Sequence, residues 1–170
     1  RRMGGVHGYS RAQIALHWTI ALLVALQCLL HEPISRAWEA SRAGEAVTFQ
    51  PLIALHVVGG LVILLLVLWR LGLLALRGAP PPPEREPRYY KLGAKLVHGA
   101  LYALLLAMPL TGLLAWFGGV APVAAIHEVL RMVLLALIVL HVLAVLVHLF
   151  VLRMPVLRRM LHPAQDSRLA

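Results

Sequence analysis

Four long hydrophobic runs divide the chain, and polar or proline-rich stretches separate them. The runs cover about residues 11–31, 52–76, 92–117 and 125–152. A helix needs about 20 predominantly apolar residues to cross the hydrocarbon core of a bilayer, and each run reaches that length. The pattern therefore predicts four membrane-spanning helices. The connecting stretches are expected to be a loop at 32–51, a loop at 77–91 and a short turn at 118–124.

Local signals support several of these helix ends. Ser10 followed by Gln13 fits a capping box at the start of the first helix. Pro51 stands just before the second helix, and Pro109 lies inside the third, where we expect a kink. The stretch APPPPEREP, residues 79–87, predicts an extended and solvated spacer.

The composition indicates an integral membrane protein rather than a soluble one. Of the 170 residues 61% are hydrophobic, whereas a soluble domain usually contains about 45–50%. The first run is long and lacks a small-residue cleavage site, which favours a retained helix over a signal peptide. We therefore expect one all-α domain over residues 1–170, an integral membrane four-helix bundle.

The positive charges predict how the bundle is oriented. The formal net charge is +9, and the basic residues lie beside the hydrophobic runs, which indicates lipid headgroups and topology rather than nucleic acid. With four crossings, the side of the termini carries thirteen of the sixteen lysines and arginines: Arg1, Arg2, Arg11, Arg70, Arg77, Arg85, Arg88, Lys91, Lys95, Arg153, Arg158, Arg159 and Arg168. The outer side keeps Arg36, Arg42 and Arg131. The positive-inside rule then places both termini in the cytoplasm.

Cysteine usage excludes several cofactor classes. The single cysteine, Cys28, rules out an intrachain disulfide, a zinc site built from cysteines and an iron–sulfur cluster. No C-x-x-C-H sequence is present, so covalently attached haem is excluded as well. Any redox or metal chemistry therefore has to use other side chains.

Histidines inside the hydrophobic runs are the strongest chemical signal. Six of the nine histidines lie within the predicted spans: His17, His56, His98, His127, His141 and His148. A single intramembrane histidine is readily explained by a hydrogen bond to a neighbouring helix. Six of them, with almost no buried acid to pair with, favour a functional role.

The helix rise sorts these histidines into two layers. His56 and His127 fall near the outer side of the membrane. The inner layer holds His17, His98, His141 and His148. His127 and His141 are fourteen residues apart, which is roughly 21 Å along the helix and only about 40° around it, so both can face the bundle interior.

Two imidazoles without sulfur or carboxylate ligands suit haem better than zinc. Zinc takes three or four protein ligands in a tetrahedron, whereas haem iron takes two axial ligands in an apolar slot between helices. Gly59 and Gly60, just below His56, leave room for a flat macrocycle, although close helix packing explains them equally well. Two haems about 20 Å apart would carry electrons across the bilayer.

Four segments resemble the bacterial cytochrome b-561 family of small four-helix dihaem membrane proteins. They are YSRAQIALHW, LIALHVVGG, HGALYALLLAMPLTG and HEVLRMVLLALIVLHVLAVLVH, and the resemblance covers about residues 9–160. It implies that His17 and His141 ligate the iron of an inner haem b, and that His56 and His127 ligate that of an outer one. It also implies a bacterial inner-membrane protein that passes electrons between a periplasmic donor, superoxide in at least one branch, and ubiquinone.

Three further residues are candidates for particular roles. Arg131, one turn after His127, is expected to draw an anionic donor or to pair with a haem propionate, unless it only reaches the headgroups. His98 and His148 are candidates for quinone contact and proton delivery, because imidazole titrates near neutral pH. The alternatives are an interhelical contact, or replacement of His141 as a ligand.

The sequence thus predicts a dihaem b-type cytochrome, an oxidoreductase that takes electrons from an outer donor such as superoxide and reduces quinone. One alternative is a membrane anchor or electron-relay subunit of a larger dehydrogenase, working with a periplasmic redox protein. Another is a divalent-metal transporter that uses the line of histidines, although it would lack the usual intramembrane carboxylates. Membrane lipid, quinone and a small donor are the expected partners, and nucleic acid is not.

Overall fold

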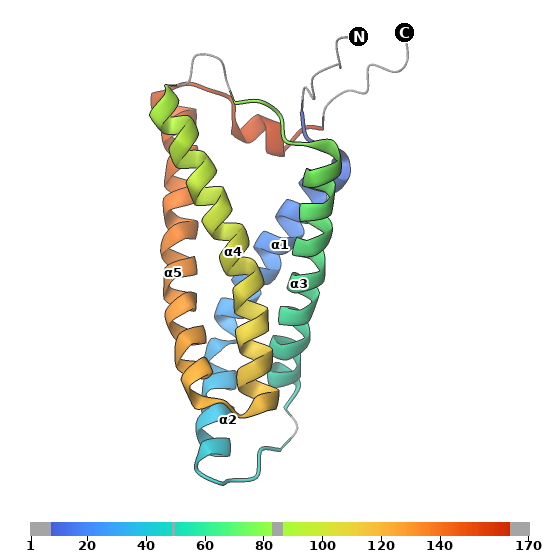
Figure 1. Cartoon of the computed structure of the whole chain (residues 1–170), viewed down its shortest axis with the longest axis vertical. Coiled ribbons are helices and arrows are strands. Elements are labelled where there is room, and N and C mark those ends of the chain that lie inside the picture. Colours follow the sequence, from blue (N-terminus) through green and yellow to red (C-terminus); the bar gives the residue numbers. More distant parts are fainter. Residues whose placement is uncertain (1–7, 49, 83–86, 164–170) are drawn as a thin grey trace.

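The computed structural model describes residues 8–48, 50–82 and 87–163, and within them every regular element is helical (Figure 1). The elements are α1 (Arg11–Leu29), α2 (His31–Arg42), α3 (Pro51–Arg77), α4 (Arg88–Gly118), α5 (Ala121–Leu146), a π-helical turn η1 (Val147–Val151) and a 3-10 helix η2 (Leu157–Met160). Helices α1, α3, α4 and α5 run up and down side by side, with the short α2 below them in Figure 1.

Four of these helices are long and apolar enough to cross a membrane: α1, α3, α4, and α5 together with η1. The expectation of an all-helical membrane bundle is therefore confirmed. The connection expected at 118–124 shrinks to two residues, Gly119 and Val120. Gly119 adopts a left-handed conformation with φ of 65° and donates its N–H to the Ala115 carbonyl, a helix ending that favours glycine.

The prediction of a loop at 32–51 is partly wrong, because the first part of this stretch forms α2. This helix was missed because its sequence, HEPISRAWEASR, has no apolar run that could cross a membrane. Short-range effects stabilise it instead. Glu32 lies in the first turn, where a negative charge complements the helix dipole, and it pairs with Arg36 at 2.8 Å. Ala37 is buried against the rest of the protein.

The predicted capping box at the start of α1 is confirmed. The Ser10 hydroxyl accepts from the Gln13 N–H at 3.2 Å, and the Gln13 side-chain oxygen accepts from the Ser10 N–H at 3.0 Å. Gln13 is buried and its amide nitrogen also donates to the Gly78 carbonyl at 3.3 Å. The cap therefore joins the start of α1 to the end of α3.

A small apolar core lies midway along the bundle. It consists of Ile20 and Val24 of α1, Ile63 and Val67 of α3, and Leu134 of α5. Many large apolar side chains elsewhere on the helices are exposed. Such a surface suits lipid, because a soluble protein rarely exposes extended apolar patches. The core separates two polar regions at opposite ends of the bundle.

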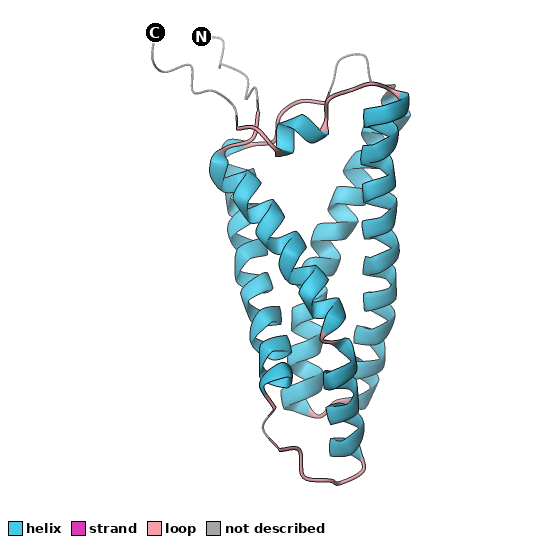
Figure 2. Ribbon diagram, turned by 180° about the vertical axis from the view of Figure 1, so that it is seen from behind, coloured by secondary structure: helices cyan, strands magenta, loops and turns pink. Residues whose placement is uncertain are grey.

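The two ends of the bundle differ in charge. We call them the terminal end, where α1 begins and α3 ends, and the α2 end, which α2 covers (Figures 1 and 2). Among the predicted cytoplasmic bases, those at or near the terminal end are Arg11, Arg70, Arg77, Arg88, Lys91, Lys95, Arg153, Arg158 and Arg159. The other four, Arg1, Arg2, Arg85 and Arg168, lie outside the described residues.

Candidate functional site

A cavity of about 670 Å³ lies at the α2 end, between all five α-helices. We call it the outer cavity. Its walls are mainly apolar and include Val24, Ile63, Leu105, Met108 and Leu134. Both histidines predicted for the outer layer line it, His56 from α3 and His127 from α5. The volume falls in the range of cofactor sites, which is about 300–1,000 Å³.

The ring of His127 is oriented by Thr111 of α4. Its Nδ1 lies 3.0 Å from the Thr111 hydroxyl oxygen, and that hydroxyl is also 2.8 Å from the Ala107 carbonyl. Because the carbonyl can only accept, the Thr111 hydroxyl donates to it and accepts from the Nδ1–H of His127. The proton is thereby assigned to Nδ1, and the Nε2 lone pair of His127 is left available for a metal.

Gly112 makes room for the same ring. A Cβ atom built on Gly112 would stand 3.1 Å from His127 Cε1, which is tighter than ordinary packing of carbon atoms. The consecutive Thr111 and Gly112 thus seat the imidazole against α4. Sequence reasoning missed both residues, although a Thr–Gly pair soon after Pro109 in an otherwise apolar helix is a visible signal.

His56 presents an uncompensated buried nitrogen. Its Nδ1 is buried and has no hydrogen-bond partner among the described residues, and the same holds for the amide nitrogen of Gln27. Burial of an unpaired polar group is costly. The two neighbouring glycines behave differently: Gly59 is buried against the Gln27 side chain, whereas Gly60 lines the outer cavity and faces open space. Gly59 thus serves helix packing, and Gly60 leaves room in the cavity.

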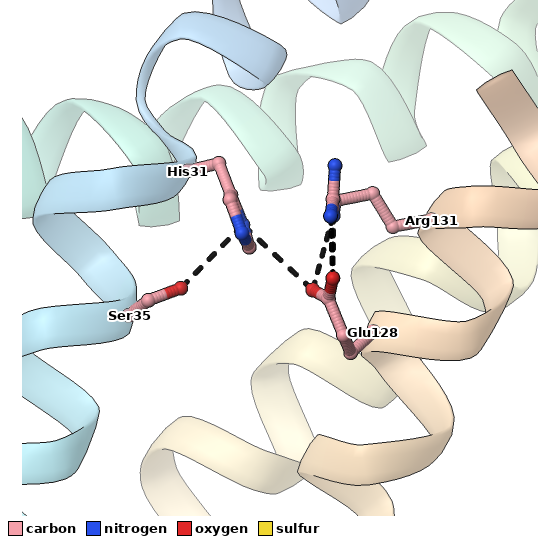
Figure 3. A network of polar contacts seen from close by, with 4 residues as sticks. All are labelled: His31, Ser35, Glu128 and Arg131. Atoms are coloured by element: carbon pink, nitrogen blue, oxygen red, sulfur yellow. Dashed lines mark hydrogen bonds and ion pairs between the residues drawn. The ribbon is translucent and has the colours of Figure 1, made fainter.

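Four residues of the outer-cavity lining, His31, Ser35, Glu128 and Arg131, form a polar network (Figure 3). We call this part of the lining the mouth of the cavity. The Arg131 Nε donates to both carboxylate oxygens of Glu128, at 3.1 and 3.0 Å, and Nη2 contacts the same group. His31 of α2 lies on the other side of Glu128, with Nδ1 3.8 Å from the nearer oxygen, and 3.5 Å from the Ser35 hydroxyl. Arg131, predicted to draw an anion, is therefore already paired with an acid.

Three of the four predicted inner histidines gather in the other half of the bundle. The ring centroids of His17 and His141 are 6.4 Å apart with planes 63° from parallel. Those of His98 and His141 are 5.1 Å apart with planes at 82°. The three rings come from α1, α4 and α5, so the fold joins residues that are far apart in the sequence.

His148 is buried in the π-helical turn η1. Its Nδ1 lies 2.7 Å from the Ala144 carbonyl, and its ring packs edge-on against Tyr90 with centroids 5.6 Å apart. His98 makes the corresponding bond to the Ala94 carbonyl at 2.6 Å. In both histidines the backbone carbonyl accepts the Nδ1–H, which assigns the proton of the neutral ring to Nδ1.

Arg70 is the most deeply placed cation near the terminal end. Its Nε donates to the Tyr102 hydroxyl at 2.9 Å, and its Nη1 contacts the Gln13 carbonyl. Both partners are neutral. Nearby, burial raises the pKa of the Tyr9 hydroxyl, an effect that the Arg70 charge partly offsets. Tyr9 therefore stays a neutral hydroxyl near physiological pH.

The described residues contain no group of three or more histidines, cysteines or acids placed to hold a metal ion. The histidines instead come in small sets at two depths. Porphyrin already supplies four ligands to its iron, so two imidazoles complete the shell. The donor set of this chain therefore fits haem iron.

Comparisons with known proteins agree with this donor set. A family model described as prokaryotic cytochrome b561 matches residues 8–163. Cytochrome b562 of Cereibacter sphaeroides is 35% identical over 159 residues, which cover 92% of this chain and 96% of that protein. A Yersinia pestis protein named "Probable superoxide oxidase CybB" is 30% identical over 178 residues, covering 90% of this chain and 95% of its own length.

Proposed function

Since the chain belongs to the prokaryotic cytochrome b561 family and is a bacterial membrane cytochrome of electron transfer, we propose that it binds two haems b and reduces ubiquinone with electrons from a periplasmic donor. Haem supplies the one-electron chemistry, and the protein positions and tunes it. The carrying observation is the gathering of imidazoles at two depths of one bundle, His56 with His127 and His17 with His141.

We assign His56 and His127 as the residues that would hold the outer haem. Three features support the assignment: both line a cavity of suitable size, Thr111 leaves His127 Nε2 unprotonated, and the buried Nδ1 of His56 has no partner among the described residues. Such a polar ring in an apolar cavity needs a bound group as partner. Gly60 and Gly112 keep the walls beside these histidines free of side chains.

We assign His17 and His141 as ligands of the inner haem. Two imidazoles on opposite sides of one iron, each bonded at about 2 Å, have ring centres roughly 6 Å apart. The 6.4 Å separation of His17 and His141 agrees with that value, whereas the 5.1 Å between His98 and His141 is too short. This comparison favours His17 over His98 as the partner of His141.

His98 and His148 are left to serve the quinone. Each holds its Nδ1 proton on a backbone carbonyl. In His98 a protonated Nε2 could then donate to a quinone oxygen and deliver that proton, and His148 would take part in the same site through its ring. Reduction of one quinone to quinol consumes two electrons and two protons. Two superoxide ions supply the two electrons and leave as two molecules of oxygen. Superoxide is proposed as donor from the name of the Yersinia pestis relative, which makes the protein an oxidoreductase.

The test is spectroscopic first and kinetic second. The purified chain, expressed with ample haem, should show reduced b-type bands and two haems per polypeptide by pyridine haemochrome. Superoxide and a soluble ubiquinone analogue should then give quinol with this protein alone. A colourless protein would exclude the cytochrome assignment, and a red protein inert towards superoxide would exclude the proposed donor.

The charge of the cavity mouth favours one alternative function. In this alternative the protein relays electrons for a periplasmic redox protein or a larger dehydrogenase. Three carboxylates, those of Glu32, Glu39 and Glu128, line the outer cavity together with Arg131. Such a mouth does not attract small anions strongly. A relay would remain inert towards superoxide in isolation and would co-purify with its periplasmic partner.

A further inference from the structure

Arg131 is the one lysine or arginine that lines the outer cavity in the described part of the chain. Its guanidinium is bound by both oxygens of Glu128, and Figure 3 shows the two groups side by side. The pair is only partly covered, since the side chain of Arg131 is 23% exposed and that of Glu128 is 47% exposed. The cation is thus partly exposed in the lining of the outer cavity, where a carboxylate already pairs with it.

Glu128 is also confined from the opposite side. His31 Nδ1 lies 3.8 Å from Glu128 Oε2, and the same nitrogen is 3.5 Å from the Ser35 hydroxyl. His31 and Ser35 belong to α2, whereas Glu128 and Arg131 belong to α5. The carboxylate therefore lies between α2 and α5, with Arg131 as its hydrogen-bonded partner.

The remaining charges of the cavity lining do not restore a positive field. Glu32 is paired with Arg36 at 2.8 Å, so the two charges largely cancel. Glu39 lines the cavity as well and adds a negative charge. Approach of a charged donor is governed by the net charge at the entrance, and the field of a close ion pair falls off faster than that of a single charge. An anion therefore gains little from Arg131.

We propose that Glu128 is a specificity-determining residue that sets the charge class of electron donor admitted to the outer cavity, because it neutralises Arg131. The inference rests on the proposed function in one respect, that the donor reduces a haem held by His56 and His127 in the outer cavity. With the Glu128 charge removed, the guanidinium acts as a single positive charge. Electron uptake from a small anion should then become roughly three- to tenfold faster.

The test uses the haem-loaded protein and two one-electron reductants of opposite charge. The SO2 radical anion from dithionite loses one electron to become SO2, and the methyl viologen radical cation loses one to become the dication. Stopped-flow absorbance gives the bimolecular rate of haem reduction by each. Glu128→Gln should speed reduction by the anion and slow reduction by the cation, and both differences from the native chain should shrink as the ionic strength rises.

Glu39→Gln is the matched control, because it removes the same charge from the same lining without touching Arg131. Its effect should be smaller, and the double variant Glu128→Gln/Arg131→Gln should lose the gain. Equal effects of the two glutamate variants, or a gain that survives without Arg131, would overturn the proposal. The artificial donors keep the test independent of superoxide: a chain inert towards superoxide disproves the proposed donor alone.

Discussion

At the scale of single residues, the environment of each histidine separates possible roles that its type alone leaves open. The Nδ1–H of His127 donates to a side-chain hydroxyl, and those of His98 and His148 donate to backbone carbonyls. His56 has no such partner among the described residues. The bond made by one nitrogen of an imidazole decides whether the other nitrogen can bind a metal or move a proton. The partner of Nδ1 therefore indicates which role each histidine can play.

The proposed ligand pairs predict which haem each alanine variant loses. His56→Ala or His127→Ala should remove the outer haem and leave the inner one, and His17→Ala or His141→Ala should do the reverse. Pyridine haemochrome should fall from about two haems to about one per chain, with two distinct residual spectra. His162→Ala, in the tail, serves as the control and should keep both. The inner assignment is wrong if His141→Ala keeps both haems while His148→Ala loses one.

Thr111→Val should weaken the outer haem site specifically. Valine has nearly the shape of threonine but cannot accept the proton of His127 Nδ1, so the ring loses its orientation. Loss of such a partner typically costs 10–100-fold in affinity. Haem transfer to apomyoglobin should show faster release of one haem only. Thr111→Ser, which keeps the hydroxyl, should behave like the native chain, and equal release from the valine and serine variants would contradict the role of the hydroxyl.

At the scale of elements, the start of α1 is stabilised by contacts that also connect it to other parts of the chain. The capping box of α1 uses Gln13, whose amide reaches the Gly78 carbonyl after α3. Trp18 of α1 donates its indole N–H to the Met160 carbonyl in η2 at 2.8 Å. These contacts keep the start of α1, and hence His17 one to two turns later, in place beside α3 and the chain after α5.

Ser10→Ala should destabilise the terminal end by about 1 kcal/mol, the usual cost of an N-cap. The alanine removes the acceptor for the Gln13 N–H, so only the bond from the backbone N–H of residue 10 to the Gln13 side chain remains. Thermal melting in detergent, followed by the Soret band, should show a lower midpoint with both haems still bound at room temperature. Ser41→Ala, on the exposed part of α2, is the control. A midpoint unchanged from the native chain would show that the cap contributes nothing measurable.

At the scale of the whole molecule, charge and cavity lie at opposite ends of one bundle. The bases of the terminal end predict a cytoplasmic position for that end, and the outer cavity with its acidic mouth then faces the periplasm. Electrons would enter through that mouth and pass the apolar core around Val67 on their way to the inner histidines. Separation of the two ends by lipid would keep the proposed periplasmic donor apart from the inner histidines.

Cysteine labelling tests this orientation. In a Cys28→Ser background, Glu45→Cys at the α2 end should react with a membrane-impermeant maleimide in intact spheroplasts. Arg158→Cys at the terminal end should react only after the membrane is opened. The reverse pattern would refute the cytoplasmic placement of the termini, whatever the haem content of the variants.

The sequence by itself determined the number and approximate extent of the spans and the cap at Ser10, because these depend on the length of an apolar run and on contacts within a few residues. It also singled out the intramembrane histidines, whose cost in lipid makes them conspicuous. Tertiary structure decided what lies beside them: Thr111 and Gly112 against His127, Glu128 on Arg131, and His98 with its ring centroid 5.1 Å from that of His141. Some of these contacts join different helices, and others depend on the direction of two side chains of the same helix. The spacing of residues along the sequence predicts neither kind of contact. The hydrophobic pattern also failed to predict α2. This helix is stabilised by the packing of Ala37 and the Glu32–Arg36 ion pair rather than by a run of apolar residues.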